Sequence, residues 1–210
     1  MKQLHGRALD EGETEGASVL IDEDRREMII SGTVDGAMFN TVCYGLGMLE
    51  AKKGPITVYI NTCGGSGYDG VGIYDRLRLC KNEIVGIAVG ACMSAGMAIL
   101  MGCDARLSTP ECRFMVHEAQ NSLPEMSTGR LGHHLDEAKA LDAAYQRILQ
   151  TKNGLTDDEI KVLCSKDTFM SAEQVMAYGL IDGILDPGLL PKNKVRKTKN
   201  TKKRSRYNVK

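Results

Sequence analysis

The sequence predicts an α/β domain with a largely parallel sheet, and three observations support this prediction. Short runs rich in β-branched residues, such as ITVYIN at 56–61 and IVGIAVG at 84–90, alternate with segments of helical periodicity. Such alternation along one chain favours parallel strands joined by crossover helices. The length of 210 residues, with 42% hydrophobic and 26% charged residues, indicates one globular domain, with or without appended segments.

The first elements are two strands and a helix. Residues 17–34 (ASVLIDEDRREMIISGTV) predict a strand, a turn over DEDRR and a second strand. Apolar residues then recur at helical spacing from 35 to 53, and the KGP that begins at Lys53 ends the helix. The strand at 56–61 leads into a glycine-rich segment and then into a helix at 71–80 (VGIYDRLRLC).

Twenty uncharged residues, 84–103, separate Glu83 from Asp104. This is about the length that crosses a bilayer. Four glycines, many alanines and the lack of flanking Trp, Tyr or a basic cluster argue against a membrane span. We expect two buried elements in series, a strand at 84–90 followed by a helix in SAGMAILMGC. Ser94 then lies at a strand-to-helix junction.

Two short strands and a long helix follow. The strands are expected at 105–108 and 112–117, with TPE as the turn between them, whereas residues 118–129 have weak periodicity that fits a loop or extended chain. An amphipathic helix is expected from 130 to 152. Its apolar stripe consists of Leu131, Leu135, Ala138, Leu141, Tyr145, Ile148 and Leu149.

The last elements begin with recognisable caps. Thr156 with Glu159, and Ser171 with Gln174, form two capping boxes, each of which predicts a short helix. The segment LIDGIL at 180–185 predicts a final strand.

The charges are unevenly distributed. The full chain has 27 basic and 27 acidic residues, but 191–210 contain ten Lys and Arg and no acid, so the first 190 residues have a net charge of −10. We expect the basic C-terminal tail to be disordered, because it lacks the apolar residues that a core requires. Contact of this tail with nucleic acid is the less favoured alternative. Residues 1–17 contain no apolar signal segment.

The seven cysteines are an odd number with no CxxC pair, and most have apolar neighbours. This pattern predicts reduced, buried thiols in a cytosolic protein, without disulfides or a metal site.

Ser94 is the first candidate for chemistry. A serine hydroxyl needs a base to become a nucleophile, and the start of a helix favours negative charge on an attacked carbonyl. The segment CMSAG matches G-x-S-x-G except that Cys92 replaces the first glycine. The alternative is that Ser94 is only the N-cap of a buried helix, and this stretch alone favours the cap.

His117 is the best-placed candidate base, because it ends an apolar strand. His133 and His134 have polar neighbours on the long helix and are expected to be solvated. Asp167 precedes a capped helix but cannot be distinguished from the other acids by the sequence alone. The glycine-rich NTCGGSG at 61–67 is compatible with an oxyanion hole or a phosphate loop, although neither GxxxxGK[ST] nor GxGxxG is present.

Four motifs together resemble the proteolytic subunit of the Clp protease, the ClpP family. YINTCGGSGYDGVGIYD resembles that family's YINSPGG…G..IYD, and GACMSAG resembles its serine segment. RFMVHEA resembles..MIHQP, and DTFMSAEQVMAYGLID resembles D.FMSA.EA.EYGLID. The resemblance spans roughly residues 18–186, and the four motifs occur in the family's order.

The resemblance implies roles for five residues. Ser94 corresponds to the nucleophile, His117 to the general base and Asp167 to the acid that orients it, while Gly65 and Ala95 correspond to the backbone donors of the oxyanion hole. The order Ser…His…Asp disfavours an α/β-hydrolase, in which the histidine comes last.

The implied fold consists of ClpP/crotonase-type stacked β-β-α units with a protruding handle helix at 130–152. The chain then divides into a flexible N-terminal segment (1–17), a ClpP-like serine peptidase domain (18–187) and a basic disordered tail (188–210). The sequence departs from the family at TCGG, which replaces SPGG, at HEA, which replaces HQP, and in the segment 118–129.

The implied function is that of a cytoplasmic serine endopeptidase that cleaves unfolded proteins or peptides inside a homo-oligomer of stacked heptameric rings. It needs no metal or other cofactor, ATP enters only through a partner AAA+ unfoldase, and no membrane is involved. Two alternatives share the fold: a phage-type head or portal maturation protease, and a catalytically weak structural ring subunit. An acyl-CoA enzyme of the crotonase type would leave the Ser-His-Asp set unexplained.

Overall fold

The computed structural model describes residues 18–119, 127–186 and 188. The predictions for the N-terminal segment, for most of 118–129 and for the basic tail therefore concern residues outside the described part of the chain.

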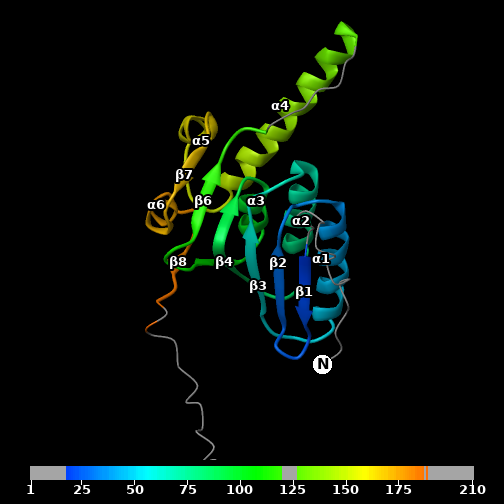
Figure 1. Ribbon diagram of the computed structural model, residues 1–210, viewed down its shortest axis with the longest axis vertical. Helices are drawn as coiled ribbons and strands as arrows, with labels where there is room; N and C mark the ends of the chain where they lie inside the picture. The colour runs from blue at the N-terminus through cyan, green and yellow to red at the C-terminus, as the bar shows by residue number, and fades with distance from the viewer. Residues whose placement is uncertain (1–17, 120–126, 187, 189–210) are drawn as a thin grey trace, which may run out of the picture.

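The described residues form a mixed α/β fold, as the sequence predicts (Figure 1). The strands are β1 (Ser18–Asp22), β2 (Glu27–Ser31), β3 (Ile56–Thr62), β4 (Ile84–Met93), β5 (Ala105–Ser108), β6 (Arg113–Val116), β7 (Thr168–Met170) and β8 (Gly183–Ile184). The helices are α1 (Gly36–Leu49), α2 (Gly67–Arg78), α3 (Ala95–Met101), α4 (Thr128–Gln150), α5 (Asp157–Cys164) and α6 (Ala172–Ala177).

The sheet is largely parallel, which confirms the predicted pairing. Its main path runs β1-β2-β3-β4-β5-β8, and β6 pairs with both β4 and β7. Only two of the pairs formed by these strands are antiparallel, namely β1 with β2 across the predicted turn and β6 with β7.

Strand β4 pairs with two different strands along its length, and this feature positions the site. Its first part, Val85–Ala88, pairs with β5, whereas its last part, Ala91–Met93, pairs with β6. The expected strands on either side of TPE therefore do not pair with each other, as a simple hairpin would. Both lie against β4, so β6 ends beside the point where β4 ends.

Alternate residues of β3 and most alternate residues of β4 are buried, and α3 is buried throughout. The chain between Glu83 and Asp104 thus forms β4 and α3 as expected, although β4 extends three residues beyond the predicted strand. No helix within the described ranges is both long and apolar enough to cross a membrane.

Helix α4 projects from the rest of the fold (Figure 1). Its C-terminal residues Ile148 and Leu149 are buried, but Leu131 and Leu135 are 41% and 50% exposed. The predicted apolar stripe is therefore covered at one end of the helix and open at the other. His133 and His134 are exposed, as expected.

Both predicted capping boxes are present, at Thr156 with Glu159 and at Ser171 with Gln174. The sequence analysis missed β7, whose three residues are too few to show a period. The expectation that the cysteines are buried is wrong for Cys63, which is exposed. It is exposed because it lies in the glycine-rich loop and not in a strand or helix.

Glu50 at the end of α1 ties this helix to α2. Its carboxylate accepts hydrogen bonds from Arg76 Nη2 at 2.5 Å and from the Lys81 N–H at 3.0 Å. The bond from Arg76 is the main reason why the pKa of Glu50 is lowered from 4.5 to about 2.

A group whose pKa falls on folding adds stability above its ordinary pKa, and that stability is lost as the pH falls toward the folded value. Replacing Glu50 by Gln should therefore lower the free energy of unfolding at pH 7 by about 1–3 kcal/mol. The difference between the two proteins should shrink between about pH 5 and pH 2. Urea unfolding of both proteins across this range measures it, and a difference that does not change with pH would contradict the assignment.

Candidate active site

Ser94 sits at the turn from β4 into α3 with a strained backbone. Its φ is 51° and its ψ is −121°, a conformation that a non-glycine residue rarely adopts. It occupies the N-cap position of α3, but its side chain makes no capping hydrogen bond. Its Oγ instead lies 2.7 Å from His117 Nε2. Ser94 therefore occupies the N-cap position that the sequence favours, but its hydroxyl contacts His117 and does not cap the helix.

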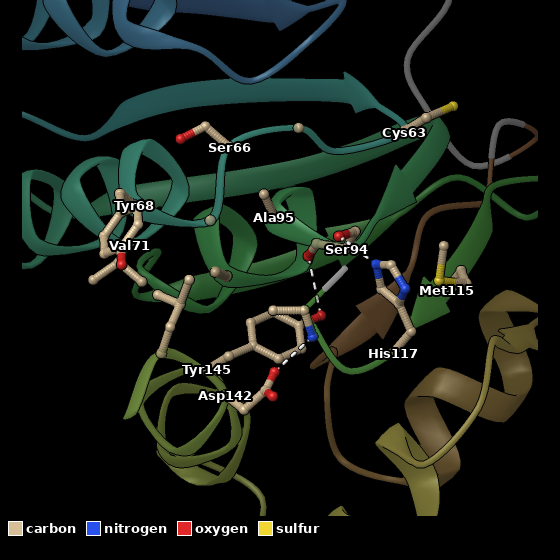
Figure 2. A pocket seen from close by; sticks show the side chains of 15 residues that line it. Cys63, Ser66, Tyr68, Val71, Ser94, Ala95, Met115, His117, Asp142 and Tyr145 are labelled. Carbon is tan, nitrogen blue, oxygen red and sulfur yellow. Dashed lines mark hydrogen bonds between the residues drawn. The ribbon is translucent and has the colours of Figure 1, made fainter. Parts of the chain in front are cut away.

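Two neighbouring elements hold this turn. The Ser94 N–H donates to the Met115 carbonyl of β6 at 2.8 Å. The Tyr145 hydroxyl, from α4, donates to the Ser94 carbonyl at 3.0 Å (Figure 2). Burial raises the pKa of Tyr145 well above its ordinary value, so this hydroxyl keeps its proton and remains a donor.

His117 and Asp167 are brought together by the pairing of β6 with β7. Val116 pairs with Thr168, so the residue after β6 and the residue before β7 lie side by side. His117 Nδ1 is 3.4 Å from Asp167 Oδ1, and the Asp167 side chain is 55% exposed. The two side chains are therefore neighbours, but this distance is longer than a well-formed hydrogen bond.

The glycine-rich loop lies directly against the serine. A β-carbon on Gly64 would lie 2.7 Å from the Ser94 β-carbon, and Gly64 has a φ of +106°. Gly65, with a φ of +150°, forms a parallel bridge with Val34. In this bridge Val34 bonds to Gly64 and Ser66 on either side, so the N–H of Gly65 points away from Val34.

Ala95 supplies a second backbone N–H beside Ser94. As the first residue of α3 it has no acceptor within the helix, because the first N–H groups of a helix lack partners one turn back. The dipole of the helix adds positive potential at this end, although α3 has only seven residues.

A cavity of about 570 Å³ opens beside these groups. It is lined by Cys63, Gly65, Ser66, Gly67, Tyr68, Val71, Ser94, Ala95, Ala98, Met115, His117, Ala119, Leu141, Asp142 and Tyr145 (Figure 2). Four of the five residues that the resemblance singled out thus line one cavity, and the fifth, Asp167, contacts it through His117.

Cys92 replaces the first glycine of the G-x-S-x-G pattern, and the structure shows how it fits. The residue is fully buried, and its thiol donates to the Gly96 carbonyl at 3.3 Å. Burial raises the pKa of the Cys92 thiol well above its usual value, which keeps it an unreactive thiol.

Sequence reasoning missed three lining residues with clear hydrogen bonds, Tyr68, Asp142 and Tyr145, and also the exposed lining residue Cys63. Tyr145 was placed in the apolar stripe of the long helix, which correctly predicts that it faces the body but not its hydrogen bond to Ser94. The spacing of Asp142 and Tyr145 by three residues puts them on one face of α4, and this was the available signal. Within the described ranges, no three His, Cys, Asp or Glu side chains gather into a metal-binding group.

Comparison with known proteins agrees with the fold. A family model described as Clp protease matches residues 14–188. Among solved structures, a ClpP1 mutant from Listeria monocytogenes superimposes with a TM-score of 0.72 and 23% sequence identity, over 78% of this chain and 93% of that chain. At this identity the structural match shows a shared fold.

The fold and the family match define a ClpP-like protein. The chain belongs to the Clp protease family, and this membership supports a peptidase.

Replacing Gly64 by Ala tests the contact between the loop and the nucleophile. The added methyl would collide with the Ser94 β-carbon, so we expect peptidase turnover to fall by roughly 10²-fold, as small displacements of reacting groups do. Turnover of a short fluorogenic peptide measures this loss. Gly132→Ala is the matched control, because an added methyl on this residue of α4 meets no atom within 4 Å. Equal turnover in the two variants would contradict the account.

Proposed function

We propose that this protein is a serine endopeptidase that uses Ser94, His117 and Asp167. The observation that carries the proposal is the 2.7 Å contact between Ser94 Oγ and His117 Nε2 at the edge of a 570 Å³ cavity. A serine that has a strained backbone and a hydroxyl directed at a histidine is typical of nucleophilic catalysis.

Acylation follows from these positions. Ser94 Oγ attacks the peptide carbonyl carbon, and His117 Nε2 takes the hydroxyl proton as the new C–O bond forms. The carbonyl oxygen becomes an oxyanion that accepts hydrogen bonds from the N–H groups of Gly65 and Ala95. His117 then gives its proton to the amide nitrogen, the C–N bond breaks, and the amine product leaves.

Deacylation repeats the same steps with water as the nucleophile. His117 removes a proton from the water, the acyl–oxygen bond to Ser94 breaks, and the serine recovers its proton. The Asp167 carboxylate, 3.4 Å from His117 Nδ1, favours the tautomer with its proton on Nδ1 and stabilises the imidazolium. Since Asp167 is more than half exposed, its stabilising effect is partly screened by water. The chemistry itself uses no metal or nucleotide.

The substrate is proposed to be an extended segment of an unfolded protein or peptide. Such a segment binds through its backbone, which gives loose selectivity along most of its length. If a folded protein is the source, an ATP-driven AAA+ unfoldase is the expected partner.

A homo-oligomer of stacked heptameric rings is proposed from the family and from the exposed stripe on α4. Leu131 and Leu135 are large apolar side chains on a helix that projects from the fold. In a particle, these residues would be covered by another copy of the chain.

The assignment of the nucleophile is tested with a fluorophosphonate probe followed by peptide mapping. The probe should label Ser94, and Ser94→Ala should abolish labelling. Ser94→Ala and His117→Ala should each lower peptidase turnover by roughly 10⁴-fold. Ser165→Ala is the serine control, because the Ser165 hydroxyl donates to the Val162 carbonyl and lies outside the cavity. Labelling that survives Ser94→Ala unchanged would refute the nucleophile.

Asp167→Asn should reduce turnover less, by roughly 10²–10³-fold, because this residue acts through His117. Labelling of Ser94 should persist in this variant at a lower rate. A loss as large as that of His117→Ala would show that Asp167 does more than orient the ring.

The oligomer is tested by adding charge to the open part of the stripe. Leu131→Glu combined with Leu135→Glu should convert the particle into smaller species in sedimentation velocity, because buried unpaired carboxylates are costly. His133→Glu combined with His134→Glu adds the same number of acidic residues to the same stretch of helix and serves as the control. A monomer for the unmodified chain at micromolar concentration would overturn the assembly.

A further inference from the structure

Asp142 places a carboxylate in the wall of the cavity, and the proposed catalytic steps leave it without a role. It lies on α4, three residues before Tyr145, so both side chains project from one face of the helix. Tyr145 reaches from α4 to the Ser94 carbonyl, and Asp142 therefore sits about one helical turn, roughly 5 Å, along the wall from that contact.

Among the described residues, only one oxygen of this carboxylate has a partner. Asp142 Oδ1 accepts the Ala119 N–H at 2.6 Å (Figure 2). Throughout the described ranges, Asp142 Oδ2 has no hydrogen-bond or ion-pair partner. The bond to Ala119 holds the carboxylate in place and leaves Oδ2 available to a ligand.

Among the described residues that line the cavity, none is Lys or Arg, and Asp142 is the single carboxylate. The lining also contains the apolar residues Val71, Ala98 and Leu141. Leu141 also packs against Gly67, which closes the cavity toward α2. An aliphatic wall with one unpaired carboxylate is complementary to a side chain with an apolar stem and a cationic end.

The residue that would occupy the cavity follows from the position of the nucleophile. The carbonyl carbon under attack belongs to the residue before the scissile bond and must lie at Ser94 Oγ, with its oxygen near the N–H groups of Gly65 and Ala95. The side chain of that same residue then extends into the adjoining cavity. The Tyr145 side chain spans the gap between α4 and Ser94. The Asp142 side chain is shorter than that of Tyr145, so only a long substrate side chain can reach its carboxylate.

From this arrangement we propose that Asp142 determines specificity and selects Arg or Lys at the residue before the scissile bond. Asp142 Oδ2 accepts a hydrogen bond from the guanidinium or ammonium group, while the methylene stem packs on Val71, Ala98 and Leu141. This inference rests on the proposed peptidase function, because it uses Ser94 to place the substrate.

The test compares two peptides that differ only in charge. One has arginine before a fluorogenic leaving group, and the other has citrulline, which has nearly the same shape but no charge. The unmodified protein should cleave the arginine peptide with a kcat/KM about tenfold or more above that of the citrulline peptide, and this preference should decrease with salt. Asp142→Asn keeps an oxygen for the Ala119 N–H and removes the charge, so it should bring the ratio close to one.

A leucine peptide and a second variant separate this effect from damage to the protein. Asp142→Asn should lower kcat/KM for the arginine peptide by a larger factor than kcat/KM for the leucine peptide, since an apolar side chain does not use the carboxylate. Asp136→Asn removes an equal charge from an exposed position of the same helix and should leave the arginine preference intact. An arginine-to-citrulline ratio near one in the unmodified protein, or a ratio unchanged in Asp142→Asn, would overturn the proposal.

Binding to the Ser94→Ala variant distinguishes failure of this inference from failure of the proposed function. Calorimetric titration with the arginine and citrulline peptides measures the selectivity of the cavity without any chemistry. Tighter binding of arginine that is lost in Ser94→Ala/Asp142→Asn would support the role of Asp142 even if no turnover were found. Equal binding of the two peptides would refute it, whatever the turnover.

Discussion

The strained turn at Ser94 is the constraint on which the rest of the site depends. A backbone with φ of 51° does not persist in isolation, because a non-glycine residue in this region is held there only by its surroundings. Here the surroundings are the bond from the Ser94 N–H to β6, the bond from Tyr145 to the Ser94 carbonyl, and the close contact with Gly64. These three restraints come from three separate segments of the chain, so the turn forms only when the whole fold has formed.

The same arrangement explains why the candidate residues meet. The first part of β4 pairs with β5 and its last part pairs with β6. Because of the second pairing, β6 ends beside Ser94. His117 therefore follows β6 at the place where the serine emerges from β4. The antiparallel strand β7 then brings Asp167 to the other side of the imidazole. Helix α4 closes the cavity from a third side and joins the site to the surface on which assembly is proposed to occur.

Much of this could be predicted from the sequence because the signals were local. The strand at 56–61, the junction at Ser94 and both capping boxes are encoded within a few residues, and the structure confirms each. The features that could not be predicted from the sequence depend on contacts between distant parts of the chain. Strand β7 is stabilised by pairing with β6 and has too few residues to show a pattern. Asp167 could be singled out only by resemblance, because its relation to His117 depends on that pairing. Asp142 appeared as one of many charges on a helix, and only the packing of α4 against the body shows that it faces a cavity.

The central claim is that the turn presents Ser94 Oγ between His117 and two backbone donors. A crystal structure of the protein after reaction with diisopropyl fluorophosphate tests it most directly. The account predicts phosphorus bonded to Ser94 Oγ, with the phosphoryl oxygen within about 3 Å of both the Gly65 and the Ala95 nitrogen atoms. A phosphoryl oxygen directed away from both nitrogen atoms, or an adduct on a different residue, would contradict it.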